Sequence, residues 1–225
     1  MLLASANGAV GMEQAWQALG SGASALDAVE IGVRQAEANP DDHTVGYAGH
    51  PNIDGVVQLD ASIMDGSSRA AGAVGAMTGY RHAITVARAV MEQTPHALIV
   101  GEGAARLASQ IGLSAEDLLT DDERTAWQRA IASGDTDLLA QVRKLTRDPQ
   151  ESIGTVNFLA RDRDGHLASA VSTSGWAFKY PGRLADSAVI GAGNYCDDRY
   201  GAAETLLDFQ GGFQSMQVFR VKNRR

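Results

Sequence analysis

The chain has 225 residues and a hydrophobic fraction of 44%, which together favour one sizeable domain with a real core. Its 27 acidic and 19 basic residues give a formal charge of −8, which repels phosphate backbones and argues against nucleic acid as a partner. No apolar run approaches the ~18 residues that a membrane span needs, so no membrane association is expected.

Two amphipathic helices are predicted near the N-terminus, after a short strand at residues 1–5. This start lacks a basic n-region, so we expect no signal peptide and a cytoplasmic protein. Apolar residues recur at helical spacing over 12–19 and stop at Gly20. Ser24 with Asp27 resembles a capping box, which opens a second helix that ends before Pro40. The two helices suggest one outer layer.

The middle of the chain first changes to short Gly-rich runs at 41–79, which predict strands and turns. Its Gly-x-x-Gly and Gly-x-Gly sequences lack the Lys-Ser/Thr ending of a phosphate loop, so small-residue packing is the better interpretation. Further on, the apolar pattern predicts helices at 84–91, 104–111 and 121–133 and a short buried strand at Leu98–Val100.

A solvated linker is expected at about 134–153. The segment is rich in charge, although apolar residues recur at 138, 139, 142 and 145, and Pro149 stands close to its end. A linker at this place is where a cleavage of the chain would fit.

A β-hairpin is predicted over 156–173, because Asp164-Gly165 stands between two apolar runs and Gly supplies the positive φ of the turn. If Gly165 is the third member of a three-residue loop, Thr155 faces Thr173. A two-residue loop would place Ser174 there instead, and a four-residue loop Ser172. Each register puts a hydroxyl group opposite Thr155.

Several ordered motifs begin at this hairpin. They are Gly-Thr at 154–155, Ser-Thr-Ser-Gly at 172–175, Gly-Arg-x-x-Asp-Ser at 182–187 and Gly-Ala-Gly-x-Tyr at 191–195. They resemble the N-terminal nucleophile (Ntn) hydrolases of the glycosylasparaginase and plant-type asparaginase family, and Leu-Asp-Ala-x-Ile-Met-Asp-Gly at 59–66 extends the resemblance. It implies an α+β fold, a four-layer αββα sandwich. It also implies a single domain, 1–225, that is cleaved into 1–154 and 155–225 and forms a homodimer of cleaved protomers.

A threonine inside a chain is a poor nucleophile, and packing is its commonest role. If the Gly154–Thr155 bond is cut, however, the new α-amine has a pKa of ~7.7–8 and can act as the base for the hydroxyl group of the same residue. The resemblance implies this cleavage site, with Thr155 as the catalytic nucleophile and Thr173 as the threonine that hydrogen-bonds it. Glycine at 154 suits this cleavage, because a strained or left-handed backbone costs it little. Many members of the family carry Asp at this position, although Gly-Thr also occurs in the plant-type branch.

The resemblance also implies a substrate site. Arg183 would hold an α-carboxylate in its planar fork, and Asp186 would receive the α-ammonium group. Without the flanking motif, a surface Arg–Asp pair would be the default interpretation. Trp176 and the loop around His50 are the candidates to face the leaving group.

The implied activity is hydrolysis of the side-chain amide of a small β-aspartyl or asparagine-linked substrate. N4-(β-N-acetylglucosaminyl)-L-asparaginase is the preferred interpretation. The alternatives are an L-asparaginase or β-aspartyl peptidase, or a non-catalytic remnant that acts as a binding or assembly module. No cofactor or metal is expected, because no histidine spacing fits a metal site at His43, His50, His82, His96 or His166.

The resemblance weakens after Ala203. The family continues with a Thr-Gly pair that contributes to the oxyanion hole, whereas Thr205 is followed here by Leu206. We therefore expect 155–225 to be a truncated small subunit. The single cysteine, Cys196, is expected to be a small buried residue rather than a nucleophile.

Overall fold

The computed structural model describes residues 1–132, 137–146, 154–184, 186–206 and 216–222. Its framework is a six-stranded sheet in the order β1-β5-β6-β2-β3-β4. Neighbouring strands are antiparallel except β3 and β4, which are parallel and joined through a helix, as parallel neighbours require. The strands are β1 (Leu2–Ala4), β2 (Leu59–Asp65), β3 (Ala71–Met77), β4 (Leu98–Val100), β5 (Val156–Arg161) and β6 (Leu167–Thr173).

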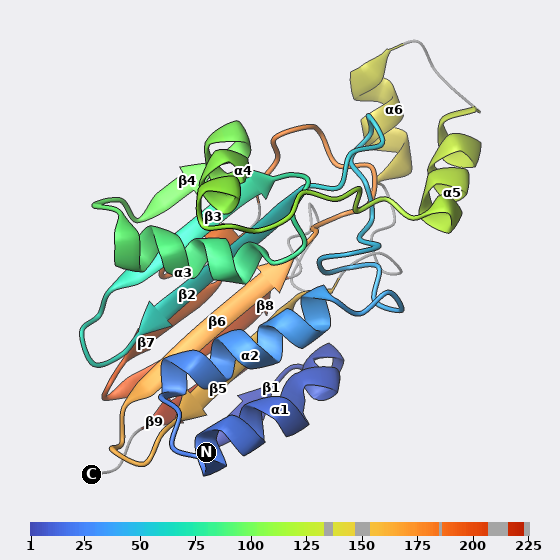
Figure 1. Ribbon diagram of the computed structural model, residues 1–225. Helices are drawn as coiled ribbons and strands as arrows, with labels where there is room; N and C mark the ends of the chain where they lie inside the picture. The colour runs from blue at the N-terminus through green and yellow to red at the C-terminus, as the bar shows by residue number, and fades with distance from the viewer. Residues whose placement is uncertain (133–136, 147–153, 185, 207–215, 223–225) are drawn as a thin grey trace.

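Helices cover one face of this sheet (Figure 1). α2 packs on β5 and β6, whereas α3 packs on β2 and β3. A second sheet of three strands, in the order β7-β8-β9, packs against β2, β5 and β6. The elements of these outer layers are α1 (Ala9–Gly20), α2 (Ala25–Glu37), α3 (Ala83–Gln93), α4 (Gly101–Gln110), β7 (Asn194–Asp197), β8 (Tyr200–Leu206) and β9 (Met216–Lys222).

The predicted α+β class is therefore confirmed. The described residues form three layers, helix, sheet and sheet, and within them no helical layer covers the outer face of the second sheet. The four-layer sandwich remains a prediction.

The predicted N-terminal helices are also confirmed. Ser24 caps α2 through the backbone N–H of Asp27, and the Asp27 carboxylate accepts from the Ser24 backbone, which completes the capping box. The strands and turns predicted for the Gly-rich stretch 41–79 are confirmed in β2, β3 and the turn between them, whereas residues 41–58 form neither helix nor strand. The predicted burial of Leu98–Val100 is wrong, since Leu98 and Val100 are 43% and 48% exposed on the edge strand β4.

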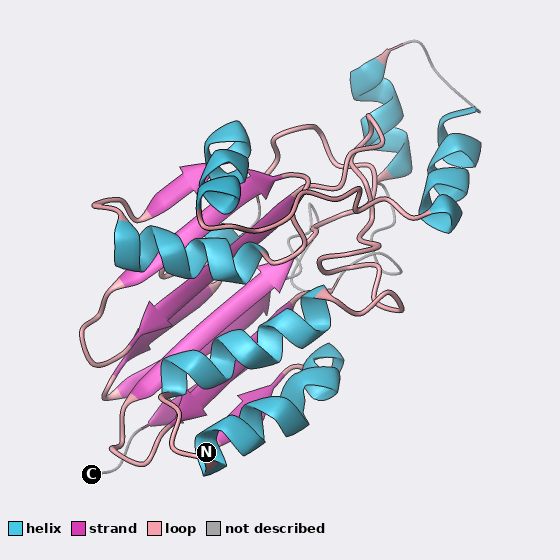
Figure 2. Cartoon of the chain, in the orientation of Figure 1, coloured by secondary structure: helices cyan, strands magenta, loops and turns pink. Residues whose placement is uncertain are grey.

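A helix interrupts the linker that was expected at 134–153. Residues Leu138–Leu145 form α6, and the Asp137 carboxylate caps it by accepting from the Leu139 N–H at 3.0 Å. The linker prediction is wrong there, because an N-cap and a regular apolar stripe suffice for a helix despite its charges. Residues 134–136 and 147–153 lie outside the described residues. α6 and α5 (Asp121–Ala132) stand at one end of the layers, where loops gather (Figure 2).

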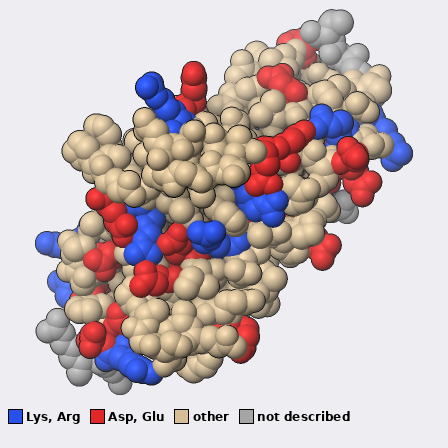
Figure 3. All heavy atoms as spheres, in the orientation of Figure 1, with Lys and Arg blue, Asp and Glu red and all other residues tan. Residues whose placement is uncertain are grey.

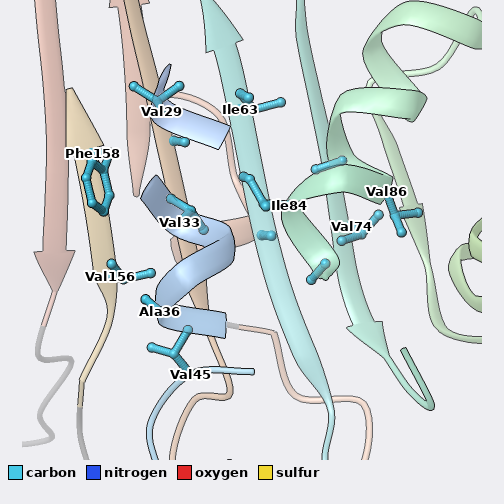
Figure 4. Close-up of a cluster of buried hydrophobic side chains, with 14 of the residues drawn as sticks. Val29, Val33, Ala36, Val45, Ile63, Val74, Ile84, Val86, Val156 and Phe158 are labelled. Atoms are coloured by element: carbon cyan, nitrogen blue, oxygen red, sulfur yellow. The ribbon is translucent and has the colours of Figure 1, made fainter. Parts of the chain in front are cut away.

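The main core lies between the helices and the six-stranded sheet. Val29, Val33 and Ala36 of α2 face the sheet beside Phe158 of β5 (Figure 4). The Phe158 ring is fully buried, and it fills the space that a side chain at Gly32 would take. Glycine at 32 thus lets α2 lie directly on the hairpin.

The outer surface of the helices carries intermixed acidic and basic side chains (Figure 3). Arg88 of α3 pairs with Asp27 and Glu30 of α2 at 2.7 and 2.8 Å and with Glu92 of its own helix at 2.7 Å. These pairs hold the two helices side by side. None of the described helices is long and apolar enough to cross a bilayer.

Replacing Gly32 with alanine should destabilise the fold. A Cβ at Gly32 would lie 2.6 Å from Phe158 Cζ, and such overpacking costs about 1–3 kcal/mol, more than the ~1 kcal/mol that alanine gains as a helix former. Urea unfolding of Gly32→Ala should show a net loss of stability. Gly20→Ala is the control, because nothing lies within 4 Å of a Cβ there. Equal stability of the two variants would contradict this account.

Candidate active site

The hairpin register is the one predicted for a three-residue loop. Asp162 donates its backbone N–H to His166 O, and Gly165 has a φ of +87°. The ladder runs from Arg161 opposite Leu167 to Val156 opposite Ser172. One step further along this register, Thr155 faces Thr173.

The backbone on both sides of the Gly154–Thr155 bond is held by hydroxyl groups. Thr173 donates its hydroxyl to Gly154 O at 2.9 Å and accepts the Gly175 N–H at 2.9 Å. The Ser5 hydroxyl donates to Thr155 O at 3.3 Å and accepts the Asn157 N–H at 3.0 Å. In the uncut chain the hydroxyl of Thr173 therefore lies on the carbonyl of the residue before the predicted nucleophile.

Glycine at 154 has a steric reason that the sequence did not reveal. A Cβ there would overlap Thr44, whose own Cβ would be 2.8 Å away. Thr44 is fixed in turn, because its hydroxyl donates to the Asp42 carboxylate at 2.5 Å and its carbonyl accepts the Ser174 N–H at 2.7 Å. The loop that carries Thr44 thus packs directly on the bond expected to be cut.

The predicted head-group residues lie in the segment that follows Thr173. The Arg183 guanidinium stacks 4.7 Å from the centre of the Trp176 ring, so Trp176 lies on the Arg183 side of the site. Asp186 begins a short 3-10 turn, Asp186–Ala188, which β2 holds through a 2.7 Å bond from Ser62 Oγ to Ser187 O. Arg183 and Asp186 are both partly buried.

Sequence reasoning missed Lys179, which is 2% exposed. Its Nζ donates to Ser174 O at 2.8 Å and to Gln58 O at 2.9 Å. Burial lowers the pKa of Lys179 to about 8; the Asp60 carboxylate opposes this shift and the Arg183 guanidinium adds to it. The signal in the sequence is a lysine inside the aromatic and apolar run 176–180.

The buried carboxyl group of Glu37, at the end of α2, lies on the face of β6 that carries the Ser172 side chain. It accepts from Ser172 Oγ at 2.7 Å and from the Ile84 N–H at 2.9 Å, and its backbone carbonyl accepts the Tyr47 N–H. Burial raises the pKa of Glu37 above its usual range. Glu37 therefore ties α2 to both the site strand and the loop after Pro40.

A polar cavity of about 470 Å³ adjoins the predicted cleavage bond. Thr44 in its wall touches Gly154, and Asn7 accepts from Ser5 Oγ, which bonds Thr155 O. His50 in the wall is held by Glu123 of α5 at 2.8 Å. The lining residues are Asn7, Asn39, Asp41, Asp42, His43, Thr44 and His50.

The predicted burial of Cys196 is confirmed. It packs with Met64 and Leu167 between the two sheets. Desolvation raises the pKa of Cys196 to about 12, so its thiolate is scarce at neutral pH. Nor do the described residues bring together three or more His, Cys, Asp or Glu side chains in a way that could hold a metal ion.

Helices over two stacked sheets, with the predicted threonine at the head of a strand in the inner sheet, are compatible with the fold of an Ntn hydrolase. A family model described as asparaginase matches residues 7–205. The chain belongs to this asparaginase family of Ntn hydrolases.

Curated relatives of two kinds are similar to the chain. An N(4)-(beta-N-acetylglucosaminyl)-L-asparaginase of Elizabethkingia miricola is 41% identical over 84% of this chain and 53% of its own length. The rat protein of that name is 37% identical over 92% of this chain and 68% of its own length. A rat isoaspartyl peptidase/L-asparaginase is 40% identical over 85% of this chain and 56% of its own length. The chain thus spans between half and about two thirds of the length of these relatives.

The burial of Lys179 should make stability depend on pH in a defined direction. Its pKa is about 8 in the folded chain against its usual 10.5, so between these values the unfolded chain binds more protons and stability rises with pH. The unfolding free energy of the wild type minus that of Lys179→Met should therefore increase by about 2 kcal/mol from pH 7 to pH 10. Urea titrations at each pH measure this difference. A constant difference would show that Lys179 has its usual pKa.

Proposed function

We propose that this chain is an amidohydrolase that cleaves the side-chain amide of asparagine-type substrates through an N-terminal Thr155, which the chain generates by cutting itself after Gly154. The observation that carries the proposal is the 2.9 Å bond from the Thr173 hydroxyl to Gly154 O. A donor at that oxygen stabilises the negative charge that develops when a nucleophile attacks the carbonyl carbon.

Self-cleavage would begin with attack of Thr155 Oγ1 on the Gly154 carbonyl carbon. Collapse of the tetrahedral intermediate breaks the C–N bond, so the acyl group moves to the hydroxyl oxygen and the nitrogen becomes a free amine. Water then hydrolyses the ester and leaves a carboxylate on Gly154. The products are residues 1–154 and 155–225 with Thr155 at a new N-terminus.

The free α-amine of Thr155 would act as the general base for its own hydroxyl. The hydroxyl attacks the side-chain carbonyl of the substrate, the leaving nitrogen takes the proton, and an aspartyl ester remains. Water hydrolyses this ester and releases aspartate. Arg183, stacked on Trp176, would hold the α-carboxylate and Asp186 the α-ammonium group, while Thr173 assists Thr155.

The cavity beside Gly154 supports a glycosylamine as the leaving group. Carboxylate, carboxamide and imidazole groups line it, and these groups pair with the hydroxyls of a sugar, whereas ammonia needs no such space. The N(4)-(beta-N-acetylglucosaminyl)-L-asparaginases among the relatives agree with this choice. The isoaspartyl peptidase/L-asparaginases support the alternative, free asparagine or a β-aspartyl dipeptide.

A homodimer of cleaved protomers is a further part of the proposal and rests on family resemblance; a cytoplasmic location is also proposed. The family's Thr-Gly pair at the oxyanion hole is incomplete here, because Thr205 is followed by Leu206. Thr205 lies in β8, where its backbone is in register with Gln217 of β9. The competing hypothesis is a remnant that no longer cleaves and serves as a binding or assembly module.

Purified full-length chain should convert with time into two fragments that separate between Gly154 and Thr155. Thr155→Ala should abolish the conversion, because no nucleophile remains. Thr173→Val should slow it by about 10²–10³, the effect of removing an oxyanion donor, whereas Thr173→Ser keeps the hydroxyl and should cleave. Intact-mass analysis of fresh and aged protein measures all four. A folded wild type that stays in one piece favours the remnant.

Turnover of β-aspartyl-glucosaminylamine should exceed that of free asparagine in kcat/KM. Asp41→Ala removes a cavity carboxylate that takes part in none of the hydrogen bonds described around Thr155, so it should lower kcat/KM for the glycosylamine by about tenfold and leave asparagine turnover unchanged. Coupled assays of aspartate release give both values. A higher kcat/KM for asparagine, or equal losses on both substrates, would assign the chain to the asparaginase branch.

A further inference from the structure

We propose that Lys179 is a positioning residue of the carboxylate subsite, where its ammonium group fixes the segment that carries Arg183 and adds a second positive charge beside the guanidinium. The inference rests on the proposed function, because that function supplies the carboxylate. It assigns a task to a residue that the catalytic steps above leave unused.

The burial of Lys179 is the first observation. Taking an ammonium group out of water is strongly unfavourable unless its surroundings compensate. Here two backbone carbonyls accept from Nζ, and no carboxylate of the described residues forms an ion pair with it. Asp60 acts on it only as a nearby charge. A group held at this cost needs a reason beyond packing.

The position of the charge is the second observation. Lys179 Nζ and Arg183 Nη1 each lie 3.2 Å from the point where a Cβ of Gly175 would stand, so the two cationic groups lie side by side. Gly175 is in the left-handed region, with a φ of +69°, and donates its N–H to Thr173. The positive charges of Lys179 and Arg183 therefore meet beside Gly175, two residues after Thr173, whose hydroxyl donates to Gly154 O. A substrate carboxylate at Arg183 would interact with both charges in a low-dielectric setting.

The bonds of Lys179 also link the parts of the subsite. Ser174, whose carbonyl it holds, follows Thr173 directly. Gln58, the other acceptor, takes the Gly182 N–H on its side-chain oxygen at 3.0 Å, and Gly182 precedes Arg183. Lys179 thus connects the end of β6, the start of β2 and the backbone next to Arg183.

The test compares carboxylate and carboxamide ligands. Binding of L-aspartate and of its α-carboxamide to the full-length protein, measured by calorimetry, needs no turnover. The wild type should prefer aspartate, and Lys179→Met should reduce that preference about tenfold while affinity for the α-carboxamide changes less than about twofold. Lys144→Met, which removes an exposed lysine of α6, is the matched control and should leave the preference intact. Lys179→Gln, which can still donate to Ser174 O, replaces Lys179→Met if that variant does not fold.

Equal losses for both ligands would reduce Lys179 to a structural role and overturn the inference, as would an unchanged preference. In the cleaved protein, Lys179→Met should raise KM for substrates with a free α-carboxylate and leave kcat little changed. If the wild type binds aspartate but hydrolyses no β-aspartyl compound, the proposed function fails while the binding comparison still decides the role of Lys179. Absence of aspartate binding by the wild type would overturn both.

Discussion

The register of the β5–β6 hairpin is the constraint on which the rest of the structure depends. Because successive side chains of a strand point to opposite faces, a shift of one residue would turn Phe158 away from α2 and bring a different hydroxyl opposite Thr155. The left-handed Gly165 selects the three-residue loop and with it the pairing of the whole hairpin. A turn at one end of the strands thereby decides which hydroxyl meets the Gly154 carbonyl at the other end.

Two buried ionisable groups, Glu37 and Lys179, flank this hairpin. Burying such groups lowers the stability of the fold, but their hydrogen bonds fix the residues on either side of Thr173. Glu37 binds Ser172, one residue before Thr173, whereas Lys179 binds Ser174, one residue after it. Each desolvated group makes strong hydrogen bonds to fixed partners. The residues on both sides of Thr173 are consequently held by hydrogen bonds to buried ionisable groups, which an apolar core could not supply.

Much of this arrangement could be predicted from the sequence, because local signals carry it. The capping box at Ser24, the Asp-Gly turn and the apolar runs identify α2 and the hairpin, and the ordered motifs point to Thr155 and Arg183. Glu37 could not be found, because charged residues are ordinarily solvent-exposed and only tertiary contacts bury it; for Lys179 the one local signal is its place in an apolar run. The same limit explains β4, whose apolar residues predicted burial although its position at the edge of the sheet exposes them. The roles of Thr155, Thr173, Arg183 and Asp186 remain proposals that their geometry supports.

The attachment of α5 has a consequence for the dynamics of this end of the molecule. α5 has no buried residue, and side chains at its surface join it to the rest of the chain. The Trp127 indole N–H donates to Ile53 O at 2.9 Å, Glu123 pairs with His50, and Arg124 pairs with Asp117. Because α5 buries no residue, its local stability is low, and it can open while both sheets stay folded. Its amide protons would then exchange with solvent long before those of β5 and β6. Each opening also releases His50, so the shape of the cavity wall fluctuates with the helix on a timescale separate from that of global unfolding.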